Sequence, residues 1–299
     1  MLDESIELLL PERERKTDAT IVDATFGAGG HTRAILARMD GGRVIAFDAD
    51  PAAVERAQRL GGEYPGRVVA VHANFADLAE RLDEIDVGEV DGILYDLGLS
   101  SLQLADTARG FSFAGTEPLD MRLDPTSDDP SAADLLETLS ERELSDVIYA
   151  NGDERHARRI ARQIVTRRQR SPLRTTSDLV AAVLSAQPRD AKRTSIHPAT
   201  RTFQALRMAV NRDVERLERS LEAAIGRLRP GARAVVISFH SGEDRAVKQT
   251  FKRWEREGRA TVLTRKPLSP SSGETSANPR SRSAKLRAAQ RIMEDPAWR

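Results

Sequence analysis

The stretch IVDATFGAGGH, residues 21–31, decides how the first part of this chain folds. Its β-branched residues and Asp23 are typical of the end of a buried strand. The run Gly27-Ala28-Gly29-Gly30 then predicts a sharp turn into a helix near Thr32, because glycine adopts backbone conformations closed to other residues. Such a turn brings bare N–H groups up against a ligand, so we expect a binding site here.

A second apolar strand follows the turn and supports this expectation. The segment RVIAFDAD, residues 43–50, ends in Asp48 and Asp50. This part of the chain therefore has the order strand, loop, helix, strand and acidic residue. The same order is found in nucleotide-binding sites, where the acidic residue binds the two ribose hydroxyls. Many strand-to-helix connections carry glycine for steric reasons alone, and Asp48 is the neighbour that favours a nucleotide site.

The composition restricts the possible chemistry. At 299 residues the chain is long enough for one elaborated domain or two. It contains no cysteine, which excludes disulfides, thiolate metal sites and a cysteine nucleophile. Its 5 histidines are scattered, so we expect no metal in the chemistry. No apolar run approaches about 18 residues and no leader is recognisable, so we expect a cytoplasmic protein.

The zero net charge hides a strong asymmetry. Residues 1–150 hold 31 acidic and 13 basic side chains, whereas residues 151–299 hold 15 acidic and 33 basic ones. This polarity predicts a polyanionic partner for the second half. A solvated basic helix face would give the same count without a partner, and the clustering of the basic residues favours the partner.

Strand and helix patterns alternate through the first hundred residues. We expect a helix over 2–10, strands at 19–23, 43–47, 67–72 and 90–95, and a polar connection over 83–89. A further strand is expected in ARAVVISFHS, residues 232–241, followed by strands at 261–264 and 283–288. This alternation predicts an α/β fold with a mostly parallel, doubly wound sheet.

The middle of the chain interrupts that pattern. From Leu104 to Thr202 helical periodicity prevails, after a long loop rich in Gly, Ser, Asp and Pro. We therefore predict an inserted all-helical domain over 104–202, with 1–103 and 203–299 forming the sheet domain. The loop also carries two aromatics of exposed type, Phe111 and Phe113.

Polar residues gather where the third and fourth strands end. Ligands of open α/β sheets bind beyond the carboxyl ends of the strands, so these positions are site candidates. The third strand is followed by Asn74 and Phe75, and this phenylalanine either flanks an adenine ring or seals the helix behind it. The fourth is followed by Asp96, Ser101 and Gln103, a density of polar groups that favours a site over simple helix capping.

The fifth strand leads into SFHSGEDR, residues 238–245, where Ser and His suggest a hydrolase. There is no G-x-S-x-G elbow, and the side chains of His240 and Ser241 diverge on a strand, which argues against that class. His240 orients a base or a loop, or it is a buried histidine satisfied by backbone. The acids that follow it can be a simple helix N-terminal charge cluster.

Three basic clusters lie in the second half. The segment 155–174 has eight arginines and no acid, and Arg158, Arg159 and Arg162 share one face of its predicted helix with Arg155. The second cluster is Lys192, Arg193, His197, Arg201 and Arg207, and the third is NPRSRSAKLR, residues 278–287. Arginine suits phosphate, and without a groove-reading motif a structured RNA fits better than duplex DNA.

With these motifs in view, the chain resembles the bacterial ribosomal RNA small subunit (cytosine-N4) methyltransferase family, which is S-adenosylmethionine-dependent and MraW-like. DATFGAGG, with an acid four residues before the first glycine, is similar to the first motif of such methyltransferases, with Thr25 where many carry glycine. The resemblance covers nearly the whole chain, through DATFGAGGHT, AFDADP, DLGLSSLQL, RGFSF, PLDMRLD, ERHARRIARQIV, HPATRTFQALRMAVN, ISFHSGEDRAVKQTF and NPRSRSAKLRAA.

The resemblance implies a class I, Rossmann-like methyltransferase domain with a helical insertion and an S-adenosylmethionine cofactor. It implies cofactor contacts at Gly29, Gly30, His31, Asp48, Phe75, Asp96 and Gln103. The implied substrate is the N4 of a cytidine in the decoding region of 16S ribosomal RNA, bare or in the assembled small subunit, with S-adenosylhomocysteine as the second product.

For the chemistry we expect Asp96 and Ser101 to accept hydrogen bonds from the N4 amine, with His240 assisting proton loss. Phe111 or Phe113 would sandwich the extruded base, and Arg158, Arg159, Arg162 and Arg201 would contact the RNA. The chain departs from the family at Gly242, where leucine is usual, and begins within a segment that usually contains histidine.

Two other classes stay open from the sequence. One is a non-catalytic RNA-binding or assembly factor that retains a nucleotide-shaped fold. The other is an NAD-dependent reductase, which would require a hydride-transfer residue that the sequence does not reveal. Binding of S-adenosylmethionine and transfer of its methyl group to RNA distinguish both from a methyltransferase.

Overall fold

The computed structural model describes residues 1–11, 17–113, 115–187 and 197–293. The chain divides into two compact units. The first comprises Met1–Leu99 and Val214–Arg299, and the second comprises Ser100–Asp213. The predicted insertion, 104–202, lies inside the second unit. Within the described residues, every helix is too short or too polar to cross a membrane.

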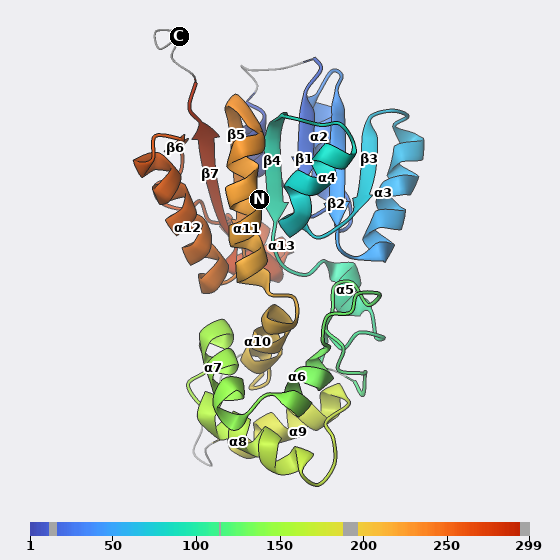
Figure 1. The fold of residues 1–299 in the computed structure, drawn as a ribbon, viewed down its shortest axis with the longest axis vertical. Helices are drawn as coiled ribbons and strands as arrows, with labels where there is room; N and C mark the ends of the chain where they lie inside the picture. The colour runs from blue at the N-terminus through green and yellow to red at the C-terminus, as the bar shows by residue number, and fades with distance from the viewer. Residues whose placement is uncertain (12–16, 114, 188–196, 294–299) are drawn as a thin grey trace. The chain divides into compact units, whose positions relative to one another are not determined.

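The first unit is built on a seven-stranded sheet of order β3-β2-β1-β4-β5-β7-β6 (Figure 1). Strands β1 to β5 run parallel, and β7 is antiparallel to both of its neighbours. The order reverses at β1, which pairs with β2 on one side and β4 on the other. The predicted α/β fold class is thereby confirmed. The strands are β1 (Thr20–Asp23), β2 (Arg43–Asp48), β3 (Val68–His72), β4 (Val90–Asp96), β5 (Leu228–Ser238), β6 (Ala260–Val262) and β7 (Lys285–Arg291).

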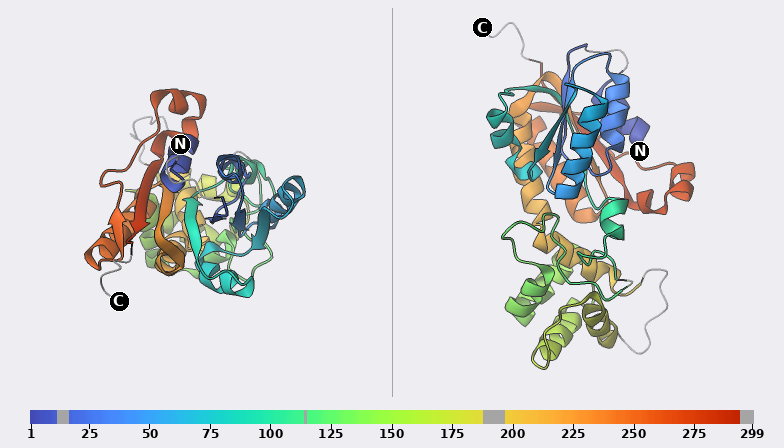
Figure 2. Two further views of the ribbon diagram at one scale, coloured as in Figure 1. Left: turned by 90° about the horizontal axis from the view of Figure 1, so that it is seen from above. Right: turned by 90° about the vertical axis from the view of Figure 1, so that its right-hand side faces the viewer.

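Helices cover both faces of this sheet, and Figure 2 gives two further views of the layers. They are α1 (Leu2–Leu9), α2 (Gly30–Arg38), α3 (Pro51–Glu63), α4 (Leu78–Glu84), α11 (Asp213–Arg227), α12 (Ser241–Arg256) and α13 (Ser272–Ala277), with short 3-10 helices η2 (Phe75–Asp77) and η3 (Pro279–Ser283). In Figure 1, α4, α11 and α12 lie in front of the strands.

Alternation along the strands decides which face each side chain joins, because successive residues of a strand point to opposite sides. Val22 and Ile93 pack with Trp254 in the core under α4, α11 and α12. Their chain neighbours Ile21 and Leu94 pack on the other face, with α1 and α2. Burial of one such aliphatic side chain stabilises the fold by about 1.5–3 kcal/mol.

The second unit is helical. Its helices are α5 (Ser101–Ala105), α6 (Ala132–Thr138), α7 (Glu141–Gly152), α8 (Ala157–Arg168), α9 (Thr176–Ala186) and α10 (Thr200–Val210). Four of them, α5, α6, α7 and α9, begin with a capping box, in which a Ser or Thr side chain and a polar side chain three residues later satisfy the backbone N–H groups of the first turn.

The long loop of the second unit is held by specific side chains. Arg122 pairs with Asp120 and donates to the Ser127 carbonyl. The Asn211 side chain donates to the Met121 carbonyl and accepts from the Leu123 N–H. Met121 itself has a positive φ of 61°, a strained conformation for a residue with a side chain. These bonds tie the described residues 120–127 of the loop to the rest of this unit.

One element differs in kind from its prediction. The polar connection expected over 83–89 begins inside a helix, α4, which ends at Glu84. The helix is anchored by Leu78 and Leu82, both fully buried, and these two positions are too few to give a clear periodic signal. Strand β5 also begins earlier than expected, at Leu228.

Candidate functional site

The glycine turn after β1 leads into α2 as the sequence predicts. Gly29 is the N-cap of α2 in the left-handed conformation, with φ of 81°. A Cβ at this position would lie 2.7 Å from the Phe26 ring, so only glycine fits. Gly30 is different, because a Cβ there would meet nothing within 4 Å. The space over Gly30, at the N-terminus of a helix, is open to a ligand.

Asp48 closes the same turn from the tip of β2. One of its oxygens accepts from the Gly27 N–H at 2.7 Å, and the other accepts from the Asp50 N–H at 2.9 Å. Burial raises the pKa of Asp48 to about 6, against the two backbone hydrogen bonds that lower it. Carboxylate oxygens have further lone pairs, so Asp48 can still accept from ribose hydroxyls.

Asp23 is a buried carboxyl group that the sequence identifies as a motif residue but not as a site residue. It accepts from the Thr32 hydroxyl at 2.6 Å and from the Thr25 N–H at 3.2 Å. Burial raises its pKa, and His31 and the hydrogen bonds oppose the rise. The sequence shows Asp23 as an acidic residue at the end of an otherwise apolar strand. In the structure its hydrogen bonds stabilise the glycine turn.

Asp96 stands at the tip of β4, beside the same turn. Its backbone N–H donates to the Thr25 hydroxyl at 2.6 Å, which ties β4 to the turn after β1. The Nδ1 atom of His31 lies 3.4 Å from Asp96 Oδ2. Burial raises the pKa of Asp96, and the charge of His31 lowers it. The exposed fraction of the Asp96 side chain is 32%, so a substrate can still reach it.

Two polar atoms of this pair are buried without a hydrogen-bond partner in the described structure, His31 Nε2 and Asp96 Oδ1. A buried polar atom without a partner costs about 1–3 kcal/mol, and two of them meet here at one ion pair. The structure thus brings together four predicted residues of the first unit: Gly29, Gly30, His31 and Asp96. Asp48 joins them through its bond to the turn.

Phe75 follows β3 in the short helix η2. Its ring meets that of Tyr95 edge to face, with centroids 5.8 Å apart. Phe75 is half-buried against the sheet core, so one part of the ring seals the core. The Tyr95 hydroxyl is hydrogen-bonded to Ser220, and burial raises its pKa, so it stays protonated. Phe75 keeps an exposed part that is available to a flat ligand.

His240 is the N-cap of α12. Its Nδ1 accepts from the backbone N–H groups of Gly242 at 3.1 Å and Glu243 at 3.3 Å. In the neutral ring the proton is then on Nε2, which lies 2.8 Å from the buried carboxyl group of Glu243. The observed contacts of His240 match the alternative in which the backbone satisfies its hydrogen bonds. A catalytic role for this residue stays a prediction.

Ser101 and Gln103 belong to the second unit, at the start of α5. Gln103 is buried, and its Oε1 accepts from the Ser100 N–H at 2.9 Å while Ser100 Oγ accepts from the Gln103 N–H. Gln103 therefore closes a capping box. Ser101 is exposed on the first turn of α5. Their predicted cofactor and catalytic roles stay predictions.

The two aromatics of the long loop differ from each other. Phe111 was expected to be exposed, which is wrong, because only 7% of its surface is accessible. The guanidinium of Arg109 lies over its ring, 5.3 Å from the centroid. Phe113 is half-buried and stacks on His197 with centroids 4.7 Å apart. The buried side chain is covered by its own loop, a contact that the sequence pattern does not reveal.

The first basic cluster is largely free for a partner. Arg158, Arg159 and Arg162 are exposed on α8, opposite the buried Ile160 and Ile164. Arg162 approaches Glu141 at 3.4 Å with 70% of its side chain exposed. The helix thus presents the cationic face that its periodicity predicts.

The other two basic clusters are partly internal. In the third, Arg287 is buried and both Lys285 and Arg287 pair with Asp244, at 3.1 and 2.7 Å. These bonds outweigh the effect of burial and hold the pKa of Asp244 below its usual value. In the second, Arg207 pairs with Asp213, and Arg201 is exposed. Lys192 and Arg193 lie outside the described residues.

Metal ligands do not converge anywhere in the described residues, where no group of three or more His, Asp or Glu side chains is arranged to hold an ion. The site in the first unit consists of glycine backbone, buried carboxyl groups and a histidine. This set suits a ligand with hydroxyl and amino groups.

Comparison with known proteins assigns the chain to a family. The model of the MraW methylase family matches residues 1–292. Ribosomal RNA small subunit methyltransferase H of Thermomicrobium roseum is 51% identical over 290 residues, which cover 92% of this chain and 88% of that protein. The enzyme of the same name from Geotalea uraniireducens is 46% identical over 308 residues, covering 98% and 97%.

Solved structures also align over most of the chain. A putative rRNA-methylase from Clostridium thermocellum aligns with a TM-score of 0.47 and 13% identity, covering 98% of this chain and 97% of that one. The family model and the curated relatives, not this alignment, decide the assignment. This chain belongs to the MraW methylase family.

Proposed function

We propose that this chain transfers a methyl group from S-adenosylmethionine to the exocyclic N4 of a cytidine in the decoding region of 16S ribosomal RNA. The observation that carries the proposal is the meeting of the glycine turn, Asp48 and Asp96 at the carboxyl edge of the sheet. The relatives' names support ribosomal RNA of the small subunit as the substrate. The choice of N4 and of the decoding region rests on the sequence motifs alone.

The residues at this edge fit S-adenosylmethionine. Gly30 leaves open space beside the N-terminus of α2, where backbone N–H groups suit a carboxylate. Asp48 suits the ribose hydroxyls, and the exposed part of Phe75 suits the adenine. The unpartnered His31 Nε2 and Asp96 Oδ1 suit polar groups of the same ligand. S-adenosylmethionine supplies an electrophilic methyl group when it is bound.

Asp96 is the residue we place nearest the chemistry. The N4 amine of cytosine is a poor nucleophile, because its lone pair is delocalised into the ring. A carboxylate that accepts a hydrogen bond from the amine restores electron density on nitrogen and takes up the proton that leaves. A pKa raised by burial makes Asp96 a stronger proton acceptor than an exposed aspartate. Ser101 is proposed as a second acceptor, with His240 as the alternative for proton loss.

The second unit is proposed to hold the RNA. The exposed arginines 158, 159, 162 and 201 suit phosphates. Phe113, stacked on His197, offers an aromatic surface to an extruded base, whereas Phe111 would need its loop to open first. The partner is ribosomal RNA, either bare or within the assembled small subunit.

Two measurements test this function. Titration calorimetry should show binding of S-adenosylmethionine by the wild-type chain and none by Asp48→Ala. Small subunits from a deletion strain, incubated with the enzyme and methyl-labelled cofactor, should gain one label on a cytidine that mass spectrometry maps. RNA binding without label transfer would favour a non-catalytic assembly factor. Binding of NAD in place of S-adenosylmethionine would favour a reductase.

A further inference from the structure

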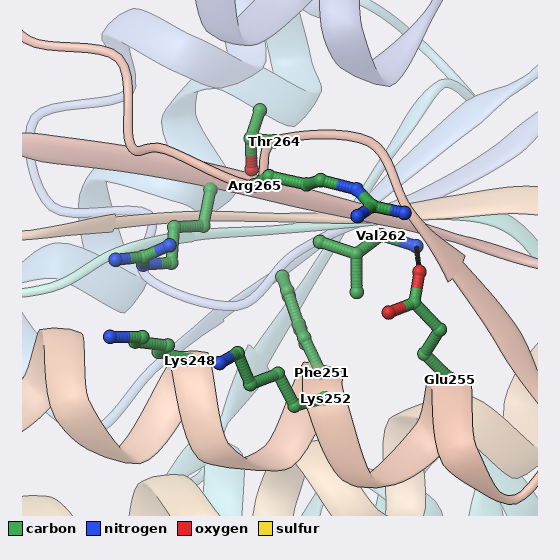
Figure 3. Close-up of a pocket in the computed structure, with 8 residues that line it drawn as sticks. Lys248, Phe251, Lys252, Glu255, Val262, Thr264 and Arg265 are labelled. Atoms are coloured by element: carbon green, nitrogen blue, oxygen red, sulfur yellow. Dashed lines mark hydrogen bonds between the residues drawn. The ribbon is translucent and has the colours of Figure 1, made fainter.

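A cavity lies in the first unit, away from the glycine turn. It measures about 210 Å³ and opens between α12 and the segment that follows β6 (Figure 3). Figure 3 shows Lys248, Phe251 and Lys252 projecting from α12, with Thr264 and Arg265 on the facing wall. No residue of the candidate methyl-transfer site lines it.

The lining is strongly cationic. Lys248, Lys252, Arg265 and Arg287 contribute four positive charges, against one carboxylate from Glu255. Arg287 pairs with Asp244, a carboxylate that it shares with Lys285, and Glu255 accepts from the Val262 N–H at 3.4 Å. Within the described part of the chain, Lys248, Lys252 and Arg265 form no ion pair. Three cations without an ion pair and one carboxylate, that of Glu255, therefore border one small cavity, and its charge is net positive.

The three exposed cations are close enough to repel one another weakly. Lys248 and Lys252 are four residues apart on α12, so they are neighbours on the helix surface and repel each other. Arg265 adds a third positive charge from the opposite wall. Elsewhere on the same helix Arg253 pairs with Glu222, which is the usual solution for an exposed cation. An anion in the cavity would remove the repulsion.

The size of the cavity restricts that anion. Sites for whole small-molecule ligands measure about 300–1,000 Å³, and this one is smaller. A phosphate group fits the volume, and lysine and arginine are its usual partners. The uncharged lining residues are Phe251, Val262 and Thr264, so charged groups dominate the lining.

We propose that this cavity binds a phosphate of the RNA backbone and extends the RNA-contacting surface to the first unit. The proposal rests on the proposed function in that RNA supplies the phosphate. Its contacts are those of Lys248, Lys252 and Arg265, which place RNA without reading its sequence.

A matched pair of double variants tests the proposal. Lys252→Gln with Arg265→Gln removes one cation from each wall. Arg256→Gln with Lys266→Gln removes two exposed cations from the same helix and the same loop, neither of which lines the cavity. The probe is a fluorescein-labelled RNA fragment of the decoding region, titrated at about 50–200 mM salt without cofactor.

The cavity variant should bind this RNA about tenfold more weakly, and the slope of log affinity against log salt should fall by about 1–2. The control variant should keep the affinity within about twofold. Equal losses in both variants, or a loss in neither, would overturn the proposal. Inorganic phosphate could stabilise the wild-type protein against unfolding while the cavity variant still binds RNA with wild-type affinity. That result would overturn the assignment of the site to RNA.

The binding assay separates this inference from the proposed function. RNA affinity is measured without S-adenosylmethionine, so a chain that transfers no methyl group still gives a result. In a methyl-transfer assay on small subunits, the cavity variant should show a raised KM for the subunit and an unchanged kcat. A fall in kcat alone would indicate damage to the catalytic site and contradict a remote RNA contact.

Discussion

The Nδ1 atom of His31 lies 3.4 Å from Oδ2 of Asp96, and each side chain keeps a second polar atom buried without a partner. The two residues come from neighbouring strands, since His31 follows β1 through the glycine turn and Asp96 ends β4. The strand order reverses between these strands, which is where open α/β sheets bind ligands. The pair is therefore placed to interact with a ligand at the sheet edge.

Asp96→Asn tests the role of the carboxylate. The amide retains the size of the side chain but cannot take up a proton, so we expect the methyl-transfer rate to fall by about 100-fold or more. Single-turnover transfer on small subunits measures this rate. Affinity for S-adenosylhomocysteine should fall by less than about tenfold, because the backbone N–H of residue 96 still bonds to Thr25.

The outcome is interpretable only if the variant is folded. Its thermal unfolding midpoint should lie close to that of the wild type. Wild-type turnover by a folded Asp96→Asn chain would exclude Asp96 as proton acceptor and direct attention to Ser101 or His240.

Asp48 should make stability depend on pH. Burial raises its pKa from 3.8 to about 6, so the folded chain binds this proton more tightly than the unfolded chain. The stabilising contribution is complete below the unfolded value and is lost as the pH rises through the folded value. We expect the free energy of unfolding of the wild type, relative to Asp48→Ala, to fall by up to about 3 kcal/mol between about pH 4 and 7.

Urea unfolding of both proteins at several pH values gives this difference. Subtracting the free energy of unfolding of the variant from that of the wild type cancels the titration of groups that Asp48 does not affect. Asp50 and Asp23 contribute through their charges, and two backbone N–H groups bond to the carboxylate. A wild-type advantage that grows with pH would show that these hydrogen bonds outweigh burial.

The sequence predicted the strands and the first site residues because their signals are local. Short runs with β-branched residues, such as VIAF at 44–47, favour a buried strand, and Asp48 directly follows this one. Gly29 was predicted from the turn, and its close contact with Phe26 three residues earlier is equally local. Such contacts span only a few residues of chain.

The remainder depends on contacts that periodicity along the sequence does not reveal. The sequence pattern places Arg287 among the RNA-facing cations. In the structure it pairs with Asp244, which is 43 residues away in sequence. Phe111 counted as exposed until its own loop folded over it. The buried network of Asp23 with Thr32 was visible as a motif, but its role as support for the turn required the distances. Helix α4 was missed because its burial involves only two side chains.

Charge reversal on α8 tests the arginine face of the second unit. Arg158, Arg159 and Arg162 replaced by Glu should weaken binding of the decoding-region RNA at least about tenfold and reduce its salt dependence. These side chains are exposed, so the fold should be retained. Affinity for S-adenosylmethionine, measured by calorimetry, should be unchanged.

A matched control has the same charge change outside the three basic clusters. Arg59, Arg256 and Lys266 are exposed and lie in the first unit. Their replacement by Glu should weaken RNA binding less than the α8 variant does. An equal effect would reduce the role of α8 to its contribution to net charge. A parallel loss of cofactor affinity would indicate unfolding.

His240 provides the last prediction, because its contacts favour helix capping over proton transfer. The ring Nδ1 accepts from two backbone N–H groups at the start of α12, which is what an N-cap side chain does. His240→Asn preserves an N-cap acceptor, whereas His240→Ala removes it. The alanine variant should lose about 0.5–2 kcal/mol of stability, and the asparagine variant should lose less.

The methyl-transfer rate then distinguishes the two roles. With capping as the role, His240→Asn should retain turnover within about threefold of the wild type, and its pH profile should keep the same shape. Proton transfer through this imidazole predicts instead that both variants lose turnover to a similar extent, because neither side chain accepts a proton near neutral pH. Turnover rates of folded variants between about pH 6 and 9 supply the comparison, and equal, large losses would place His240 in the chemistry beside Asp96.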